Sequence, residues 1–344
     1  MEKLFTVSAT PHLRDKTNIP TIMYSVAAAL LPALVGAVYF FGNRALILII
    51  ISIVTCVATE GIIQKLSGKH LTIRDGSALV TGILLAFNLP GGVSWWIPVA
   101  GGIFAIAVGK MTFGGLGYNF MNPALLGRVF LLFSWPVAMT KTWTIPRGIT
   151  QIDAETIATP LAILKETNTF LKSPPEDASI EMINNAMSTM ADLNTAYMNL
   201  FVGRVSGCIG ETSVLLLIIG AAFLMYKHYI GWRIPFSFIG TVALLTWIFG
   251  GYEGLFSGPW LYHMLSGGLI IGAFFMATDM VTSPITPKGR LIFGIGCGIL
   301  TTIIRLFGGY PEGVSFAILL MNLTAPLIDR YTRPKVFGEA RKHA

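Results

Sequence analysis

The stretch that decides the fold is ALILIIISIVTCVATEGIIQK, residues 45–65, which holds only two charged residues in 21 positions. An α-helix of about 20 residues, rising about 1.5 Å per residue, crosses the hydrocarbon core of a bilayer. Residues 22–41, IMYSVAAALLPALVGAVYFF, carry no charge and are separated from this stretch by Gly42, Asn43 and Arg44. The pattern predicts two transmembrane helices joined by a short turn.

The composition of the whole chain agrees with a membrane protein. Of the 344 residues, 53% are hydrophobic and 12% are charged, against about 25% charged residues in an average soluble domain. The formal charge is +7, but Lys and Arg lie in short loops beside apolar segments, so no nucleic-acid partner is expected. Cys56, Cys208 and Cys297 are widely separated and form no C-x-x-C pair. They are expected to be buried apolar residues, and no metal site is predicted.

Apolar segments recur along the chain and predict an all-α polytopic membrane protein with about ten transmembrane helices. The segments are 22–41, 45–65, 77–89, 95–110 and 123–139, followed by 213–229, 235–249, 261–278, 290–308 and 312–328. We expect four regions, which are a first five-helix membrane repeat (1–139), an outer-face loop region (140–206), a second five-helix membrane repeat (207–330) and a cytoplasmic tail (331–344).

The positions of basic residues predict the orientation in the membrane. With a cytoplasmic amino terminus, the basic clusters of alternate loops and of the carboxyl-terminal tail all fall inside, as the positive-inside rule requires. The interval 140–203 then lies on the outer face, and it carries seven carboxylates against four Lys or Arg residues. Both termini are therefore expected in the cytoplasm.

Two short segments predict how the halves are related. Five helices per half is an odd number, so two related halves must be inverted relative to each other. Residues 76–90 and 266–284 are each third in their half, and both are interrupted by Gly or Pro. Broken helices at matching positions are typical of a central site whose free backbone groups are satisfied within the protein. The sequence thus predicts two inverted repeats with short, broken third helices.

The polar interval between the halves is rich in Pro and Gly and has weak periodicity around 180–200, where one short surface helix is expected. Pro160 biases Thr159 toward an extended backbone. From the residues alone, the Thr159 hydroxyl is expected to project from an outer-face loop.

Four motifs carry a resemblance to a known family over essentially the whole chain. They are DGSALVTG at 75–82, GGLGYN with MNPA at 114–124, ATDMVTSP at 277–284, and YPEG at 310–313 followed by residues 317–322. In this order they resemble the family that contains the membrane protein RnfD of the Rnf complex and its relative NqrB of the sodium-pumping NADH:quinone reductase. The amino-terminal extension expected of the reductase protein is absent, which favours the Rnf-like D type.

The resemblance implies a flavin on the interval between the halves. In this family an Asp-x-x-Ser/Thr-x-Ala-Thr sequence marks a threonine joined to FMN through its phosphate, and Asp153, Thr156, Ala158 and Thr159 occupy those places. Ile157 stands where a smaller residue is commoner. Relatives further imply a separate flavin transferase that makes the bond, and a second, non-covalent flavin, riboflavin, in the membrane part.

The resemblance also implies the function. The chain would be one component of a complex in a prokaryotic cytoplasmic membrane that couples electron transfer between ferredoxin and NAD to translocation of Na⁺ or H⁺. It would work with the A, B, C, E and G components of the Rnf type, would not be a complete enzyme alone, and contains no residue that we single out as catalytic. From the residues alone, a channel or transporter for a small solute remains an alternative, as does a structural anchor for partner subunits.

Several polar residues within apolar segments need partners. Asp75 and Asp279, at the ends of the short third segments, could bind a cation, cap a helix or face a flavin. The charged residues in or beside spans must reach an interface or a partner, and these are Glu60, Lys110, Arg128 and Arg305. His263 could relay protons or pack by hydrogen bonding. The intramembrane amides could bridge helices or line a cavity, and these are Asn88, Asn119, Asn122 and Asn322.

Overall fold

The computed structural model describes residues 17–144, 146, 158–175, 178–211 and 213–334. Within these ranges the chain forms helices and no β-strand, apart from a single antiparallel bridge between Pro90 and Cys208. Three helices are long and apolar enough to cross a membrane, and five apolar helices are shorter. The predicted class, an all-α membrane protein with several spans, is confirmed.

The first half of the chain begins with a pair of long helices. It contains α1 (Ile19–Phe41), α2 (Asn43–Leu66), the short 3-10 helix η1 (Ile73–Asp75), α3 (Ser77–Phe87), α4 (Trp96–Ile106), the π-helix η2 (Ala107–Met111), α5 (Pro123–Ser134) and α6 (Pro136–Thr140). The expected single span 123–139 is divided at Trp135, because Pro136 disfavours helical geometry in the residue before it.

The second half has a helix that is broken near its middle. It contains α10 (Val214–Tyr226), α11 (Arg233–Phe249), α12 (Trp260–Leu265), α13 (Leu269–Ile271), the π-helix η3 (Gly272–Met276), α14 (Pro287–Phe307) and α15 (Val314–Thr332). The break lies at Gly267 and Gly268, whose φ angles of 68° and 65° are left-handed, a geometry that glycine adopts without the steric cost of a Cβ.

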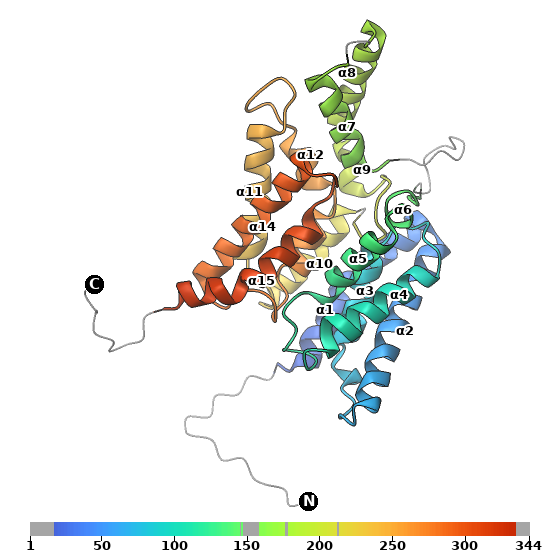
Figure 1. Ribbon diagram of the computed structural model, residues 1–344, viewed down its shortest axis with the longest axis vertical. Helices are drawn as coiled ribbons and strands as arrows, with labels where there is room; N and C mark the ends of the chain where they lie inside the picture. The colour runs from blue at the N-terminus through green and yellow to red at the C-terminus, as the bar shows by residue number, and fades with distance from the viewer. Residues whose placement is uncertain (1–16, 145, 147–157, 176–177, 212, 335–344) are drawn as a thin grey trace, which may run out of the picture.

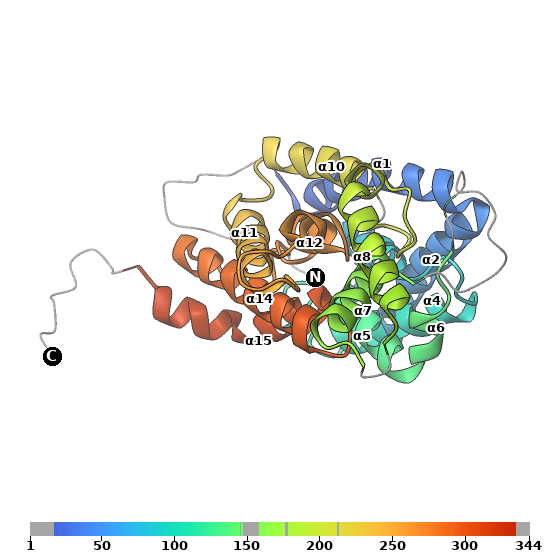
Figure 2. The ribbon, with the colours of Figure 1, turned by 90° about the horizontal axis from the view of Figure 1, so that it is seen from above.

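The two halves pack with the same internal pattern (Figures 1 and 2). In the first, α2 packs against α3 and α4, and α4 packs against α5; in the second, α11 packs against α12 and α14, and α14 against α15. The halves meet through α1 against α10 and through α5 against α15. Gly220 of α10 lies so close to the Ala29 carbonyl of α1 that an added Cβ would overlap it.

Three helices connect the first half of the chain to the second. The sequence predicts a loop region with one short helix in this interval. The three helices are α7 (Pro160–Lys172), α8 (Ile180–Thr195) and α9 (Tyr197–Val202), and α7 and α8 extend beyond one end of the bundle (Figure 1). On α7, Leu161, Leu164 and Asn168 are buried at helical spacing. Leu164 packs with Met190 of α8 and Tyr262 of α12, so the buried face of α7 fixes it against the bundle.

Candidate functional site

Thr159 lies at the amino-terminal end of α7 and is buried. Its backbone is extended (φ −66°, ψ 151°), and its hydroxyl accepts a hydrogen bond from the Ala162 backbone N–H at 3.3 Å. Only 5% of the residue is exposed. The extended backbone is confirmed, but the hydroxyl does not project into solvent as expected, because Thr159 caps a helix whose buried face holds it against the bundle. Asp153, Thr156 and Ile157 lie outside the described residues.

A cavity opens beside Thr159, at the end of the bundle that carries α7, and is named here the Thr159 cavity. Its volume is ≈ 380 Å³, within the range of about 300–1,000 Å³ found for small-molecule sites. Aromatic side chains form part of its wall, and the rings of Tyr310 and Phe316 stack with centroids 5.7 Å apart. The wall of the cavity also includes Arg128, Thr140, Trp143, Glu312 and Ser315.

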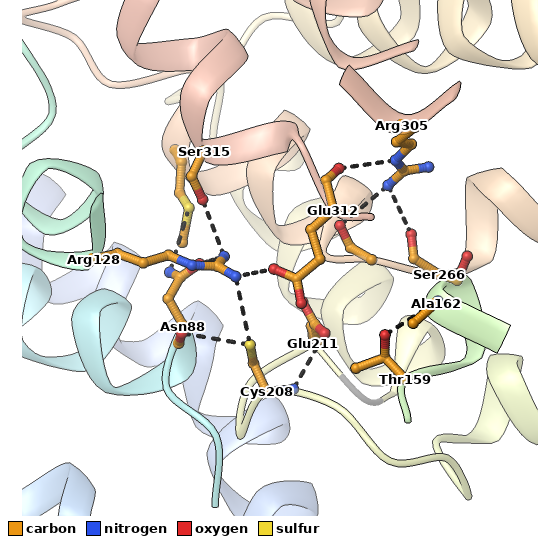
Figure 3. Close-up of polar contacts among 12 residues, drawn as sticks. Asn88, Arg128, Thr159, Ala162, Cys208, Glu211, Ser266, Arg305, Glu312 and Ser315 are labelled. Carbon is orange, nitrogen blue, oxygen red and sulfur yellow. Dashed lines mark hydrogen bonds and ion pairs between the residues drawn. The ribbon is translucent and has the colours of Figure 1, made fainter. Parts of the chain in front are cut away.

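A buried cation reaches this cavity from α5. The Arg128 guanidinium pairs with the Glu312 carboxylate, and it donates to the Asn88 side-chain oxygen at 2.7 Å and to the Ser315 hydroxyl at 3.0 Å. Figure 3 shows Arg128 and Glu312 pointing toward each other. The expectation that Arg128 needs a partner inside the protein is confirmed.

Below this pair lie a thiol and a second carboxylate. The Cys208 backbone N–H donates to Glu211 at 3.2 Å, and the Cys208 thiol donates to the Asn88 carbonyl at 3.4 Å. One ligand atom from each of Cys208, Glu211 and Glu312 lies within 4.8 Å of the others. The Arg128 guanidinium already supplies a positive charge to this group, since it contacts both Glu312 and the Cys208 sulfur.

Arg305 satisfies the carbonyl groups that the break between α12 and α13 leaves free. Its guanidinium donates to the carbonyls of His263 (2.6 Å), Ser266 (3.0 Å) and Gly267 (3.1 Å). A fourth bond goes to the Glu312 carbonyl at 3.0 Å. Helix ends inside a membrane protein need such partners, because no water is present to replace them.

A second cavity, the Asn122 cavity, lies toward the end of the bundle where α1 begins, since Ile22 and Met23 line it. Three of the four sequence motifs meet here. Ser77 and Thr81 come from the first motif, Asn119 and Asn122 from the second, and Thr278 and Asp279 from the third. The π-helices contribute as well, with Lys110 from η2 and Phe274 and Phe275 from η3, and π-helical turns are frequent at functional sites.

The charged side chains around the Asn122 cavity form ion pairs or hydrogen bonds with other protein groups. Lys110 donates to both oxygens of Glu60 at 2.8 Å and to the Ser77 hydroxyl at 2.5 Å. Asp75 accepts from the Ser77 backbone N–H at 2.8 Å, next to the start of α3. Asp279 accepts from the Thr282 hydroxyl at 3.0 Å. The four intramembrane charges named from the sequence therefore all have protein partners.

Asparagines bridge the halves, which confirms their expected role. Asn122 donates to the Met276 carbonyl at 3.3 Å, and Asn88 donates to the Met276 sulfur at 3.7 Å. With its amide nitrogen donating to the Ile318 and Thr282 carbonyls, Asn322 accepts from the Asn122 backbone N–H at 3.1 Å. Asn88 also bonds to Arg128, so a chain of contacts runs from the Thr159 cavity to the Asn122 cavity.

Glu211 and Glu312 are the site residues that sequence reasoning missed. Glu312 stands in the YPEG motif, and a carboxylate within a motif was the available signal. Glu211 lies outside all four motifs, and no pattern in the sequence pointed to it. His263 is buried, and neither of its ring nitrogens has a hydrogen-bond partner among the described residues.

Comparison with known proteins gives evidence on the family of the chain that is independent of this geometry. The model of the NQR2, RnfD, RnfE family matches residues 6–338. The chain belongs to this family. The D subunit of the proton-translocating ferredoxin:NAD(+) oxidoreductase complex of Clostridium ljungdahlii is 47% identical over 99% of this chain and 98% of its own length. The D subunit of the Na(+)-translocating ferredoxin:NAD(+) oxidoreductase complex of Acetobacterium woodii is 49% identical over 97% and 95%.

More distant members align over most of the chain as well. The D subunit of an ion-translocating oxidoreductase complex from Stutzerimonas stutzeri is 39% identical over 94% of this chain and 93% of its own length. The match to the NQR2, RnfD, RnfE family spans every helix from α1 to α15. Both cavities therefore lie within the region that this chain shares with its family.

Proposed function

We propose that the chain is the D-type membrane subunit of an ion-translocating ferredoxin:NAD oxidoreductase complex. The observation that carries the proposal is the similarity to two such subunits over nearly the full length of both chains. The chain would not be a complete enzyme by itself. Its partners would be the other membrane subunits of the complex, a peripheral flavoprotein on the outer face, and soluble iron–sulfur and NADH-binding subunits on the inner face.

We infer an inverted five-plus-five arrangement of ten spans, with both termini in the cytoplasm and α7–α9 on the outer face. The packing pattern supports it, because the second helix of each half contacts the third and fourth, and the fourth contacts the fifth. The halves also meet first helix to first (α1 and α10) and fifth to fifth (α5 and α15). A two-fold axis in the membrane plane relates inverted repeats in this way.

The Thr159 cavity is proposed as the place of a covalent FMN, joined through its phosphate to the Thr159 oxygen by a flavin transferase. A phosphate on the residue that caps α7 would lie at the positive end of a 13-residue helix, which favours an anion. The Tyr310 and Phe316 rings on the cavity wall suit a flat aromatic ring system, and the Arg128 cation would favour the negative charge that a flavin gains on reduction. When bound, the flavin would supply electron transfer, and the protein would position it.

The Asn122 cavity is proposed as the place of the second, non-covalent flavin. Its volume is ≈ 90 Å³, below the range of about 300–1,000 Å³ found for small-molecule sites, so the side chains that line it would have to move apart when riboflavin binds. The Asn119 side-chain oxygen lines this cavity, is buried, and has no hydrogen-bond partner among the described residues. It could accept a hydrogen bond from a ring N–H or a hydroxyl of riboflavin. Phe274 and Leu84 would supply apolar contacts to the flavin. Asn119 and Asn122 would form hydrogen bonds with the polar groups of riboflavin. Because riboflavin carries no phosphate group, the site needs no cation to bind one.

The experiment is to express the full-length chain with its flavin transferase and measure in-gel flavin fluorescence after denaturation. The wild-type protein should fluoresce, and peptide mass analysis should place an FMN adduct on Thr159. Thr159→Ala should abolish the signal, whereas Thr140→Ala, which changes another threonine of the same cavity wall, should retain it. Fluorescence that persists in Thr159→Ala would overturn the assignment, and absence of flavin from the mature wild-type protein would favour the transporter alternative.

A further inference from the structure

A third cavity lies between α7 and the neighbouring ends of α11 and α14, and is named here the His263 cavity. Its volume is ≈ 260 Å³. Residues from α7 form one side, Phe249 ends α11, and Phe307 ends α14. It shares no lining residue with the Thr159 cavity or the Asn122 cavity, so neither proposed flavin would fill it.

Two buried polar side chains face the His263 cavity without complete hydrogen bonding. His263 is 4% exposed, and neither ring nitrogen has a partner among the described residues. Asn168 is 8% exposed and donates to the Gly250 carbonyl at 2.7 Å, but its side-chain oxygen has no partner within the same part of the chain. A buried polar atom without a partner is costly. A ligand with hydroxyl groups could both donate to Asn168 and bond to the imidazole.

The cavity carries an excess of positive charge. Lys165, Lys172 and Arg305 line it, and no carboxylate of the described residues does. The Lys165 ammonium donates to the Gly308 carbonyl at the end of α14, and burial lowers the pKa of Lys165 below its usual value of 10.5. None of the ion pairs between described residues involves these three cations. An anion in the cavity would offset both the desolvation of Lys165 and the unbalanced charge of the two lysines, since Arg305 already has the Glu211 and Glu312 carboxylates near it.

The rim of the cavity is apolar. Phe249 and Phe307 are exposed large hydrophobic residues, and each marks the point where an apolar helix ends. Leu161, Leu164 and Leu306 also line the cavity. Side chains at this level meet both the acyl chains and the headgroups of a bilayer. The ligand is therefore expected to be an anionic amphiphile and not a small ion alone.

We propose that the His263 cavity binds the headgroup of an anionic phospholipid that carries free hydroxyls, of the phosphatidylglycerol class. Its phosphate pairs with Lys165 and Lys172, and its glycerol hydroxyls bond to Asn168 and His263. Its acyl chains lie against Phe249 and Phe307. Because Arg305 donates to the carbonyls of His263, Ser266 and Gly267 around the break between α12 and α13, a bound lipid stabilises that break from the membrane side.

The test is native mass spectrometry of the full-length protein, purified in its complex and titrated with defined lipids. The probes are dioleoyl phosphatidylglycerol, dioleoyl phosphatidylcholine with the same acyl chains, and glycerol 3-phosphate without acyl chains. The first variant combines Lys165→Gln with Lys172→Gln. The second is Lys172→Glu alone, which changes a side chain at the end of α7 and so spares the fold. Lys141→Glu, an exposed lysine that does not line this cavity, is the matched control.

We expect one phosphatidylglycerol per chain, bound at least about tenfold more tightly than phosphatidylcholine, as one charge-assisted contact implies. Both cavity variants should lose this preference, and Lys141→Glu should keep it. Equal binding of the two lipids, or an unchanged preference in both variants, would overturn the proposal. Glycerol 3-phosphate that binds as tightly as phosphatidylglycerol would also overturn it, since the site would then recognise a phosphate ester instead of a lipid.

Discussion

Arg128 of α5 and Glu312, which stands just before α15, form an ion pair across the contact between the two halves of the bundle. Both side chains line the Thr159 cavity, and the same guanidinium holds Asn88 below it. The pair is therefore both a wall of the proposed flavin site and a link between the helix sets. Removing Arg128 alone leaves two neighbouring carboxylates without their cation, whereas removing both members of the pair leaves one.

Replacing only Arg128 of this pair should strongly destabilise the protein. Arg128→Met leaves the Glu312 carboxylate without its cation and beside Glu211, which costs about 3–5 kcal/mol, whereas replacing both members leaves Glu211 as the one carboxylate of this group. We expect Arg128→Met to unfold at a lower temperature than the double variant with Glu312→Gln. Unfolding can be followed by thiol labelling, since Cys56, Cys208 and Cys297 are all buried.

Glu312→Gln alone completes this double-mutant cycle. It should lower the unfolding temperature less than Arg128→Met does, because the Glu211 carboxylate stays near the guanidinium as a counter-charge. Additive effects of the two single substitutions would contradict the ion pair, since residues in one network show coupling of about 0.5–3 kcal/mol.

Gly220→Ala should weaken the contact between the halves. The new Cβ would overlap the Ala29 carbonyl oxygen, a backbone atom that cannot move without shifting α1. Overpacking of this kind costs about 1–3 kcal/mol, and the same thermal assay measures it. Gly240→Ala on α11 is the matched control, since nothing lies within 4 Å of its added Cβ, and helix propensity predicts no loss of stability there. An equal response of the two variants would argue against the α1–α10 contact.

The cap that Thr159 places on α7 has an effect that can be separated from flavin attachment. In protein made without the flavin transferase, Thr159→Ala should lose the bond to the Ala162 N–H, at a cost of about 0.5–2 kcal/mol to the first turn of α7. Hydrogen exchange at Ala162 should then be about 2- to 30-fold faster. Thr159→Ser should exchange like the wild type, because serine caps as well as threonine does. Unchanged exchange in Thr159→Ala would mean that the capping bond is absent in solution.

The proposed orientation predicts which residues a membrane-impermeant thiol reagent reaches. Lys141→Cys lies on the expected outer side and should be labelled in intact cells, whereas Lys288→Cys, at the start of α14, should be labelled only after permeabilisation. The native cysteines are buried and should give little background. Labelling of both positions in intact cells would exclude the topology.

Much of the helical structure could be predicted because its signals are local. The apolar lengths of α1, α2 and α14 are encoded in consecutive residues, and so are the glycines that break the helix before α13. The structure differs from the sequence prediction in two places. Thr159 and Pro160 start α7 where the sequence predicts a loop, and Pro136 divides a span that the sequence predicts to be continuous.

The sequence by itself determined that this is a helical membrane protein and which motifs it carries, because hydropathy, length and residue order need no knowledge of packing. Only the tertiary structure decided that Lys110 pairs with Glu60 and Arg128 with Glu312, and that three motifs line the Asn122 cavity. It also decided that Thr159 is buried beside aromatic rings. The partner of a buried charge is chosen by which helices lie side by side, and residues 50 or 184 positions apart in the chain are brought together only by that packing.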